Sequence, residues 1–495
     1  MPSSGSSKPY LAFDFGAESG RAILAHLHSG VLTTQEIHRF KNEPVEYGGS
    51  LHWDVARLWW EVRKALSSVE EIQLAGMGVD AWGVDYALLG EKGELLQNPY
   101  HYRDARTANR MEQVFRKVPR EEIYMATGIQ FMSINTLYQL FAAAQDTPSL
   151  LKAAQKFLTI PDLFHFWLTG NAVCEYTNAT TTQLVDPRTR TWARDLIERL
   201  GLPAHFWPDI VEPGTFLGKL APRIVQHSAL ADTPVIAPAT HDTGSAVAAI
   251  SAREGTAFLS SGTWSLLGTE LDAPVINPKA LQMNFTNEGG VNGTTRLLKN
   301  VMGLWMLQCC RQTWESQGKC HDYLELMELA SRESPFTSLV DPDHESFLRP
   351  GDMPANIDRF CTQTHQPAPA SPPAYARAIL ESLAFKYRLV LSNLEELIGR
   401  RIEQIRVIGG GSKNRFLNQM TADATGRRVI AGPAEATALG NVALQILATG
   451  AAASLKEVRG IMERSFPVEV FEPVDPAKWD RQAKRFEQYC EVVYA

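Results

Sequence analysis

The sequence predicts an α/β protein built from two halves. Residues 11–27 have the pattern of an apolar strand, a tight turn of small residues and a second apolar strand, and residues 256–271 repeat this pattern. In each half, strand-like segments are interspersed with amphipathic helical segments, which is typical of mixed α/β folds. At 495 residues, the chain is also too long for one domain of ordinary size and long enough for two large ones.

In the first half, strands are expected at residues 10–14, 21–27 and 31–40. Asp54 precedes apolar residues at helical spacing, so we expect it to cap a helix that begins at residue 55. Further strands are expected at 72–79 and 84–89, and the polar stretch 176–183 is expected to be a loop or a sheet edge. The segment VDAWGVD, residues 79–85, joins the expected strands 72–79 and 84–89. In it, two acids and a tryptophan flank a glycine at a strand end. Strand ends of this kind are where α/β folds place ligands.

The middle of the chain joins the two halves. Residues 233–239 are expected to form a short strand that leads to Thr240, His241, Asp242, Thr243 and Gly244, after which a helix begins. The domain boundary is expected near residue 247, which gives domains of 1–247 and 248–495. In the second half, helices are expected near 300–314, 375–398, 413–425, 434–448 and 479–494, and strands at 404–408 and 428–431.

Composition and charge exclude several function classes. Lys and Arg number 48 against 55 Asp and Glu, a net charge of −7, which argues against a nucleic-acid partner because such proteins usually carry a basic patch. No apolar run approaches the roughly 18–20 residues of a membrane span. The six cysteines are scattered and form no CxxC pair, as in reduced cytosolic proteins. We therefore expect a cytoplasmic protein without a nucleic-acid or membrane partner, whose oligomeric state the sequence leaves open.

Two turns and a glycine run are candidate phosphate sites. The turn after residue 14 offers backbone N–H groups that can cradle a phosphate, and Asp14 could hold a magnesium ion through water. The turn that contains Thr263 is its counterpart in the second half. The run Gly409–Gly411, between a strand and a helix, would let a nucleotide approach the backbone closely, although it lacks the Lys-Ser/Thr of a P-loop. Ordinary β-turns and a sharp strand-to-helix turn explain the same residues.

Asp242 is the candidate general base. A carboxylate at a strand end and a helix start could accept a hydroxyl proton while a phosphoryl group arrives, or it could simply cap the helix. His241 could hydrogen-bond a polyol or pack as a structural histidine. Asp80, Trp82 and Arg103 are further candidates for the ligand site, although Arg103 and the next residue could form a plain surface ion pair.

Several stretches taken together resemble the FGGY family of carbohydrate kinases. These are LAFDFGAESGR, THDTGSA, LSSGTWS, IGGGSKN and AEATALGN, in the expected order. Others, namely DAWGVDYALL, YRDAR, GIQFMSINTLYQL, EYTNATTTQL, FTNEGG and LLKNVMGLWMLQ, are similar to the family members that phosphorylate L-rhamnulose. Together they span most of residues 10–445.

The resemblance implies two actin-like domains of the ribonuclease-H type around a central cleft. Residues 1–247 would bind the sugar and carry the first phosphate hairpin, and residues 248–495 would bind ATP. It implies ATP and Mg²⁺ as cofactors, a small-molecule sugar as substrate and phosphoryl transfer to the 1-hydroxyl of L-rhamnulose, in L-rhamnose catabolism. Two alternatives stay open: another ketose, such as L-fuculose, L-ribulose or D-xylulose, and a non-sugar actin-like ATPase switch.

The resemblance also assigns roles to residues. It makes Asp242 the proton acceptor and Asp14 the acid near the metal and phosphates. The expected sugar-binding residues are Gly83, His241, Asp242, Thr243 and Asn300, to which the residue patterns add Asp80, Trp82 and Arg103. The expected ATP-binding residues are Ala17, Glu18, Ser19, Gly20, Arg21, Thr263, Gln308, Gly410 and Gly411. Glu18 departs from the family, which usually has serine there, and a carboxylate beside a triphosphate is repelled unless it points away or faces Mg²⁺.

Overall fold

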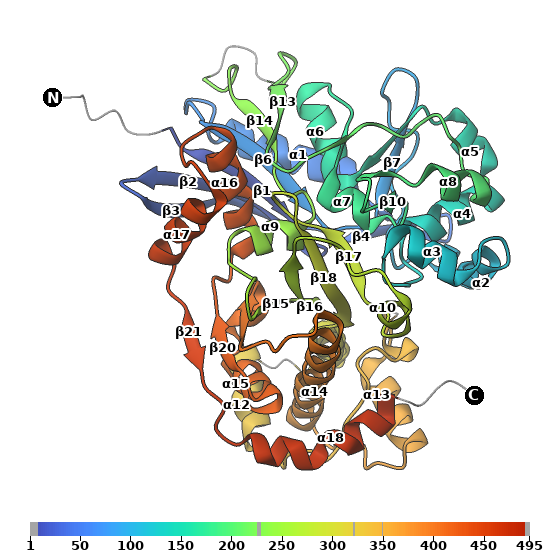
Figure 1. The fold of residues 1–495 in the computed structure, drawn as a ribbon, viewed down its shortest axis with the longest axis vertical. Helices are drawn as coiled ribbons and strands as arrows, with labels where there is room; N and C mark the ends of the chain where they lie inside the picture. Colours follow the sequence, from blue (N-terminus) through green and yellow to red (C-terminus); the bar gives the residue numbers. More distant parts are fainter. Residues whose placement is uncertain (1–7, 225–228, 320–321, 349, 491–495) are drawn as a thin grey trace. The chain divides into compact units, whose positions relative to one another are not determined.

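The computed structural model describes residues 8–224, 229–319, 322–348 and 350–490. The chain packs into two units, each made of three segments (Figure 1). Unit 1 comprises Met1–Ser251, Glu270–Leu297 and Ala436–Phe466, and unit 2 comprises Ala252–Thr269, Leu298–Glu435 and Pro467–Ala495. The chain first passes from unit 1 to unit 2 after Ser251, close to the expected domain boundary near residue 247. Two later segments, Glu270–Leu297 and Ala436–Phe466, belong to unit 1 again.

Unit 1 is built on a six-stranded sheet of order β13-β14-β6-β1-β2-β3. The predicted hairpin is present as β1 (Tyr10–Phe15) and β2 (Ser19–His28), which pair antiparallel, and β3 (Val31–Lys41) extends it. On its other side β1 runs parallel to β6 (Gly76–Ala81), and β6 runs parallel to β14 (Pro234–Ala237). The last strand, β13 (Thr215–Lys219), is antiparallel to β14.

Three helices of unit 1 matter for the site. Asp54 caps α1 (Val55–Ser67) as expected, because its carboxylate accepts a hydrogen bond from the Arg57 N–H at 3.0 Å. Helix α9 (Asp242–Ala248) begins at the candidate base. The expectation of a loop at 176–183 was wrong, since most of this stretch forms α7 (Tyr176–Thr181). The carboxylate of Glu175 caps α7 by accepting from two of its first N–H groups, which offsets the weak helix propensity of the threonines.

The remaining elements before residue 252 are short. The strands are β4 (Pro44–Tyr47), β5 (Ser50–Trp53), β7 (Tyr86–Leu89), β8 (Lys156–Thr159), β9 (Cys174–Glu175), β10 (Val185–Asp186), β11 (Thr191–Trp192) and β12 (Ile210–Val211). The helices are η1 (Ala105–Thr107), α2 (Arg110–Phe115), α3 (Arg120–Thr127), α4 (Thr136–Asp146), α5 (Pro148–Ala153), α6 (Ile160–Thr169) and α8 (Arg194–Leu200).

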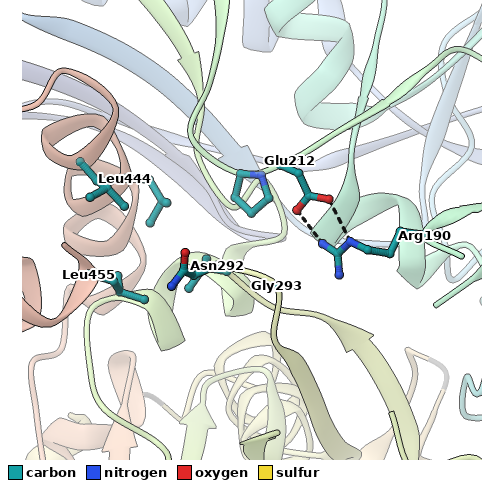
Figure 2. Close-up of a pocket in the computed structure, with 9 residues that line it drawn as sticks. Arg190, Glu212, Asn292, Gly293, Leu444 and Leu455 are labelled. Carbon is teal, nitrogen blue, oxygen red and sulfur yellow. Dashed lines mark hydrogen bonds and ion pairs between the residues drawn. The ribbon is translucent and has the colours of Figure 1, made fainter. Parts of the chain in front are cut away.

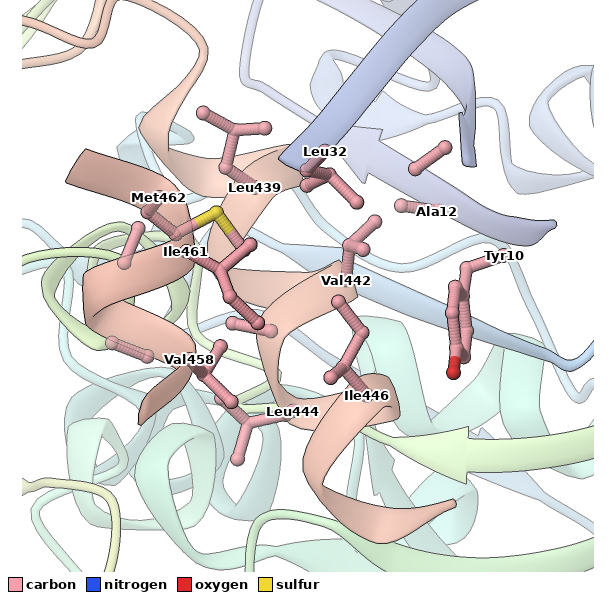
Figure 3. Close-up of a cluster of buried hydrophobic side chains, with 14 of the residues drawn as sticks. Tyr10, Ala12, Leu32, Leu439, Val442, Leu444, Ile446, Val458, Ile461 and Met462 are labelled. Atoms are coloured by element: carbon pink, nitrogen blue, oxygen red, sulfur yellow. The ribbon is translucent and has the colours of Figure 1, made fainter. Parts of the chain in front are cut away.

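The segment that returns last to unit 1 forms α16 (Ala436–Ala448) and α17 (Leu455–Ser465). Their apolar side chains share one buried cluster with strands β1 to β3 (Figure 3). The cluster includes Tyr10, Ala12, Leu32, Leu439, Val442, Leu444, Ile446, Val458, Ile461 and Met462. Small residues let α16 approach α9 closely: a Cβ atom on Gly440 would lie 1.7 Å from the carbonyl oxygen of Ser245. This packing is why residues 436–466 belong to unit 1.

The second sheet has the order β17-β18-β16-β15-β19-β20-β21. Its hairpin is β15 (Thr256–Ser261) with β16 (Trp264–Leu271), and β15 runs parallel to β19 (Gln404–Ile408), which runs parallel to β20 (Arg428–Ala431). The end strand β21 (Glu469–Phe471) is antiparallel to β20. This is the pattern of the first sheet repeated: a hairpin, two parallel strands beside it, and an antiparallel strand at the edge. The two halves therefore share one architecture.

The other elements of the second half are β17 (Thr286–Gly289), β18 (Thr295–Met302), α10 (Pro278–Gln282), α11 (Trp305–Ser316), α12 (Tyr323–Arg332), η2 (Glu345–Phe347), α13 (Met353–Gln363), α14 (Pro372–Ile398), η3 (Gly410–Lys413), α15 (Arg415–Thr425) and α18 (Pro476–Cys490). Among the helices of the described residues, none is both long and apolar enough to cross a membrane. Five cysteines are described and all have free thiols, and Cys320 lies outside the described residues.

Candidate active site

Asp14 lies near the end of β1 and is held by a cation from the neighbouring strand. Arg21 is its cross-strand partner in β2, and Nε and Nη2 of Arg21 donate to Oδ2 of Asp14 at 2.9 and 2.6 Å. On the other side, Asp80 is its partner in the parallel strand β6. Two carboxylates and one guanidinium thus meet at this edge of the first sheet.

The turn between β1 and β2 is fixed by Asn42. The side-chain amide of Asn42 donates to the carbonyl of Gly16 at 2.9 Å, and its backbone N–H donates to the carbonyl of Glu18 at 2.9 Å. The N–H of Gly16 closes the turn on the carbonyl of Ser19. Ala17 is half-buried, and Glu18 is exposed. The turn is therefore a rigid loop, and the Glu18 side chain reaches solvent.

Gly20 sits where only glycine fits. A Cβ atom on Gly20 would lie 2.3 Å from the ring of Phe40 in β3. The aromatic ring thus packs directly on the backbone that leads out of the turn. This contact explains the glycine structurally, whether or not a ligand approaches from the other side.

Asp80 is fully buried at the end of β6. Its Oδ2 accepts a hydrogen bond of 2.6 Å from the side-chain amide of Asn441 in α16. Burial and the nearby Asp14 raise the pKa of Asp80 well above its ordinary value, although the Asn441 bond opposes this shift. The carboxyl group therefore ties α16 to the sheet behind the candidate site.

Trp82 is held by a buried network centred on Asp85. Oδ2 of Asp85 accepts from the indole N–H groups of Trp53 at 2.6 Å and Trp82 at 3.0 Å, and from the backbone N–H of Tyr102 at 3.2 Å. Its Oδ1 accepts from the side chain of Gln139 at 2.8 Å. Burial raises the pKa of Asp85 to about 6, against the effect of these bonds. The ring of Trp82 is thereby fixed against Trp53, with ring centroids 4.1 Å apart.

Arg103 follows this network in sequence. Its backbone N–H donates to Nδ1 of His101 at 3.0 Å, and its guanidinium carbon lies 5.3 Å from the ring centroid of Tyr102. Tyr102 and Trp82 both donate a hydrogen bond to Asp85. Arg103, which lies over the Tyr102 ring, is therefore close to the same aromatic cluster as Trp82.

Gly83 lies against α7. A Cβ atom on Gly83 would lie 3.0 Å from the side chain of Thr181, and the Thr181 hydroxyl accepts from the N–H of Val84 at 3.0 Å. Val84 adopts φ of 65°, a strained conformation for a β-branched residue. Asn178, also in α7, donates to the carbonyls of Trp82 at 3.3 Å and Thr240 at 3.4 Å. Helix α7 thus joins the 80–85 loop to the segment that carries the candidate base.

His241 and Asp242 begin α9 beside the end of β6, where Ala81 forms a bridge with His241. Oδ1 of Asp242 accepts from the Thr243 N–H at 2.5 Å and from the Thr243 hydroxyl at 3.2 Å, and it lies 3.4 Å from Nε2 of His241. All these contacts use Oδ1, so Oδ2 has no recorded partner in the described part of the chain. The side chain of Asp242 is 31% exposed. Asp242 therefore has one anchored oxygen and one that can face a ligand.

The charge state of Asp242 is set by its surroundings. Partial removal from water raises the pKa of Asp242 above its ordinary value, His241 lowers it by a smaller amount, and Asp14 raises it again. A carboxylate with a raised pKa is a stronger base than an ordinary aspartate. Asp14, Asp80 and Asp242 influence one another, which places them around one region of unit 1.

In unit 2, the glycine run packs on the end of the second hairpin. A Cβ atom on Gly411 would lie 2.0 Å from Oγ of Ser261, and Gly409 adopts φ of 80°, which favours glycine. A Cβ atom on Gly410 would meet no atom within 4 Å. The backbone at Gly410 is therefore open to approach, while its neighbours are fixed by packing.

The start of α11 closes on the same hairpin turn. The N–H groups of Gly303 and Trp305 donate to the carbonyl of Thr263 at 3.1 and 3.2 Å. Gln308 lies in the first turn of α11 and donates its N–H to Leu304 at 2.9 Å. Four predicted ATP-binding residues, Thr263, Gln308, Gly410 and Gly411, thus occupy elements that pack on this turn. Asn300 lies in β18 and is half-buried.

The sequence of the chain matches two family models along its length. Residues 9–249 match the N-terminal domain of the FGGY family of carbohydrate kinases, and residues 257–449 match its C-terminal domain. The chain belongs to this family. It is therefore a sugar kinase, a phosphotransferase that acts on a carbohydrate.

Relatives of this FGGY kinase agree with the family models. A rhamnulokinase of Bacteroides thetaiotaomicron is 45% identical over 95% of this chain and 97% of the relative, and one of Oceanobacillus iheyensis is 42% identical over 94% and 98%. A ligand-bound xylulose kinase of Lactobacillus acidophilus has a TM-score of 0.80 at 19% identity, covering 98% of this chain and 97% of that one. A Plasmodium falciparum glycerol kinase with ADP has a TM-score of 0.77 at 17% identity, covering 99% of each. These likenesses confirm the predicted fold of two actin-like, ribonuclease-H-type domains.

Sequence reasoning missed several polar residues that support the site of this kinase. Asn441, Glu175, Asn178, Glu288 and Arg296 are all buried or nearly so. The available signal was the presence of charged and amide side chains inside apolar or threonine-rich stretches, such as EYTNATTTQ and TNEGG. Buried polar groups are usually hydrogen-bonded, so each such residue implies a specific partner that the sequence does not name.

A pocket of about 370 Å³ in unit 1 holds none of the predicted site residues (Figure 2). Its polar wall is Arg190, which forms two hydrogen bonds of 2.9 and 2.6 Å with Glu212. Its apolar wall includes Leu444 and Leu455. The Arg190 guanidinium is paired with Glu212, and its carbon lies 3.6 Å from the ring centroid of Tyr176. Arg190 therefore has little capacity left to bind a ligand in this pocket.

Proposed function

We propose that this kinase transfers the γ-phosphoryl group of ATP to the 1-hydroxyl of L-rhamnulose and so makes L-rhamnulose 1-phosphate, in L-rhamnose catabolism. The proposed substrate rests on one observation: the rhamnulokinases described above are 42–45% identical to this chain over at least 94% of its length. Identity at this level over nearly the whole of both chains is much closer than the 17–19% shared with the xylulose and glycerol kinases. We expect the enzyme to work in the cytoplasm.

Asp242 is proposed as the general base. The proton of the 1-hydroxyl passes to Oδ2 of Asp242 while the hydroxyl oxygen forms a bond to the γ-phosphorus and the bond from that phosphorus to the bridging oxygen of ADP breaks. The anchoring of Oδ1 by Thr243 keeps the carboxylate in one orientation. Its raised pKa supports this role, because proton transfer is then more favourable.

The remaining predicted residues are proposed to bind the two substrates. Trp82, Gly83, Arg103, His241, Thr243 and Asn300 would bind the sugar, with Asp80 positioning α16 behind them. Ala17–Arg21 would contact the phosphates of ATP, and Thr263, Gln308, Gly410 and Gly411 would bind the rest of the nucleotide. The open backbone at Gly410 and the rigid turn at Ala17 support these roles.

A magnesium ion is proposed beside Asp14. Among the described residues, no group of three or more histidine, cysteine, aspartate and glutamate side chains has the geometry of a metal site. The carboxylate of Asp14 nevertheless fits Mg²⁺, which prefers oxygen ligands and commonly binds to one or two carboxylates, water and substrate phosphates. When bound, the ion would offset the charge of the phosphates. The Arg21 guanidinium, 2.6 Å from Oδ2 of Asp14, fixes the orientation of this carboxylate.

Replacing Glu18 by serine is expected to lower the KM for ATP by less than about 5-fold, with kcat unchanged. Glu18 is exposed, so water and salt screen its repulsion of the phosphates to about 1 kcal/mol or less. Steady-state kinetics with varied ATP measures this, with the exposed Glu91→Ser as control. A KM that rises more than tenfold would mean that the Glu18 carboxylate takes part in binding, for example through the metal.

The substrate itself is tested by mass detection of phosphorylated products from ATP, Mg²⁺ and a panel of L-rhamnulose, L-fuculose, L-ribulose and D-xylulose. We expect L-rhamnulose to give the highest kcat/KM. A higher value for another ketose would make that sugar the substrate. ATP hydrolysis that needs no sugar and yields no phosphosugar would instead indicate an actin-like ATPase switch.

A further inference from the structure

A fully buried arginine, Arg296, contacts the Nδ1 atom of His241. Arg296 lies near the start of β18, and its Nε donates to the carbonyl of Gly289 at 2.8 Å. Its Nη2 lies 3.1 Å from Nδ1 of His241, with hydrogen-bond geometry, and 3.2 Å from Oε2 of Glu288. Within the described residues, Nη1 has no hydrogen-bond partner. A fully buried guanidinium is costly unless it is paired, and Arg296 makes polar contacts with a carbonyl, a carboxylate and His241.

The contact decides which nitrogen of His241 carries the proton. A guanidinium has only donors and stays protonated in proteins, so Nδ1 of His241 must accept the bond from Nη2 of Arg296. An imidazole that accepts at Nδ1 carries its hydrogen on Nε2. Nε2 is the atom that lies 3.4 Å from Oδ1 of Asp242. The N–H of the ring therefore faces the carboxylate of the candidate base.

We propose that Arg296 is a positioning residue that keeps the ring hydrogen of His241 on Nε2, so that the histidine donates toward Asp242 and the sugar. This rests on the proposed function, in which Asp242 is the base. An imidazolium at this place would turn an N–H of Nδ1 toward the N–H of Arg296, which is repulsive.

Several charged groups compete over the state of His241. Glu288 lies 3.2 Å from Nδ1 and Asp242 lies beside Nε2, and both favour a protonated ring. A third carboxylate, Glu175, accepts from the N–H and the hydroxyl of Thr240, the residue before His241, at 2.8 Å each. Arg296 is the cation that opposes these carboxylates. Removing it leaves Glu288 and Asp242 to draw a proton onto the histidine.

The direct test is the protonation state of His241, which needs no substrate. In protein labelled with ¹⁵N-histidine, the His241 signal is identified by its loss in His241→Gln. We expect the wild-type ring to carry its hydrogen on Nε2. In Arg296→Met we expect hydrogen on Nδ1 as well, because Glu288, 3.2 Å from Nδ1, can then accept from it without competition. A wild-type ring that is protonated, or that carries its hydrogen on Nδ1, would overturn the proposal.

Kinetics separate a positioning role from a structural one. In Arg296→Met we expect kcat with L-rhamnulose to fall about 10–100-fold at pH 7, with the KM for the sugar changed less than about 3-fold. Arg296→Lys keeps a cationic donor and should recover most of kcat. The exposed Arg188→Met, which loses a bidentate pair with Asp186, is the control.

The outcomes remain distinguishable from those of the proposed function. If Arg296→Met only lowers Tm and leaves kcat and the His241 signal unchanged, Arg296 is structural and the proposal is wrong. If Arg296→Met does not fold, the wild-type and Arg296→Lys spectra decide, since both are expected to show the ring hydrogen on Nε2. A wild-type enzyme with this ring but no activity on L-rhamnulose would contradict the proposed substrate and not the role of Arg296.

Discussion

Replacing Asp242 by asparagine is expected to lower kcat by about 10²–10⁴-fold while the fold and sugar binding persist. The amide keeps the size of the side chain and an oxygen that can accept from Thr243, but it cannot take a proton from the sugar hydroxyl. A coupled assay of ADP release measures kcat, and calorimetric titration measures sugar affinity. Near wild-type turnover would show that Asp242 is not the base.

The pH profile gives a second view of the same residue. The raised pKa of Asp242 means that the carboxylate is protonated at a higher pH than an ordinary aspartate. Because only the ionised form accepts a proton, activity should fall with decreasing pH through this raised pKa, and this limb should be absent from the residual activity of Asp242→Asn. Asp54→Asn is the matched control, since asparagine also caps a helix well.

Replacing Gly440 by alanine is expected to lower the free energy of unfolding of unit 1 by about 3 kcal/mol or more. The new Cβ atom would lie 1.7 Å from the backbone oxygen of Ser245, so α16 and α9 must move apart. Because Asp242 begins α9, kcat should fall together with stability. Calorimetric melting and kcat at a permissive temperature measure both effects.

The same substitution at Gly460 should have the opposite sign. Gly460 lies inside α17, and its Cβ atom would meet only the end of the flexible Arg464 side chain, at 3.3 Å. Alanine there is expected to stabilise the protein by about 0.5–1 kcal/mol through its higher helix propensity. If both variants melted at the wild-type temperature, the close packing of α16 on α9 would not limit stability.

Local patterns were enough to predict the two hairpins and the presence of α9, although α9 begins at Asp242, three residues before the predicted start. Each hairpin is an alternation of apolar runs and small turn residues, and such signals lie within about 15 neighbouring residues. The cap at Asp54 was predictable for the same reason, because the side chain bonds a backbone group three residues away. Helix α7 was missed, since threonines favour strands or turns and glutamate, which caps it here at Glu175, is not among the residues usually preferred at a helix N-cap.

The supporting contacts of the site could not be predicted from the sequence, because they join residues that are far apart in the chain. Asn441 bonds Asp80 across 361 residues, and Arg296 reaches His241 across 55. Nothing in the local sequence distinguishes a buried asparagine that ties a helix to a carboxyl group from one on the surface. The same holds for the return of residues 436–466 to unit 1, which depends on how small side chains of α16 match α9 and β1.

That return has a consequence for the order in which the protein is made. The strands β1 to β3 leave the ribosome long before α16 and α17, which supply the apolar residues that cover Tyr10, Ala12 and Leu32 (Figure 3). At about 5–20 residues per second, the interval between them is on the order of a minute or less. Segment 298–435 of unit 2 is synthesised within that interval. This face of the first sheet therefore stays without the cover of α16 and α17 until late in translation.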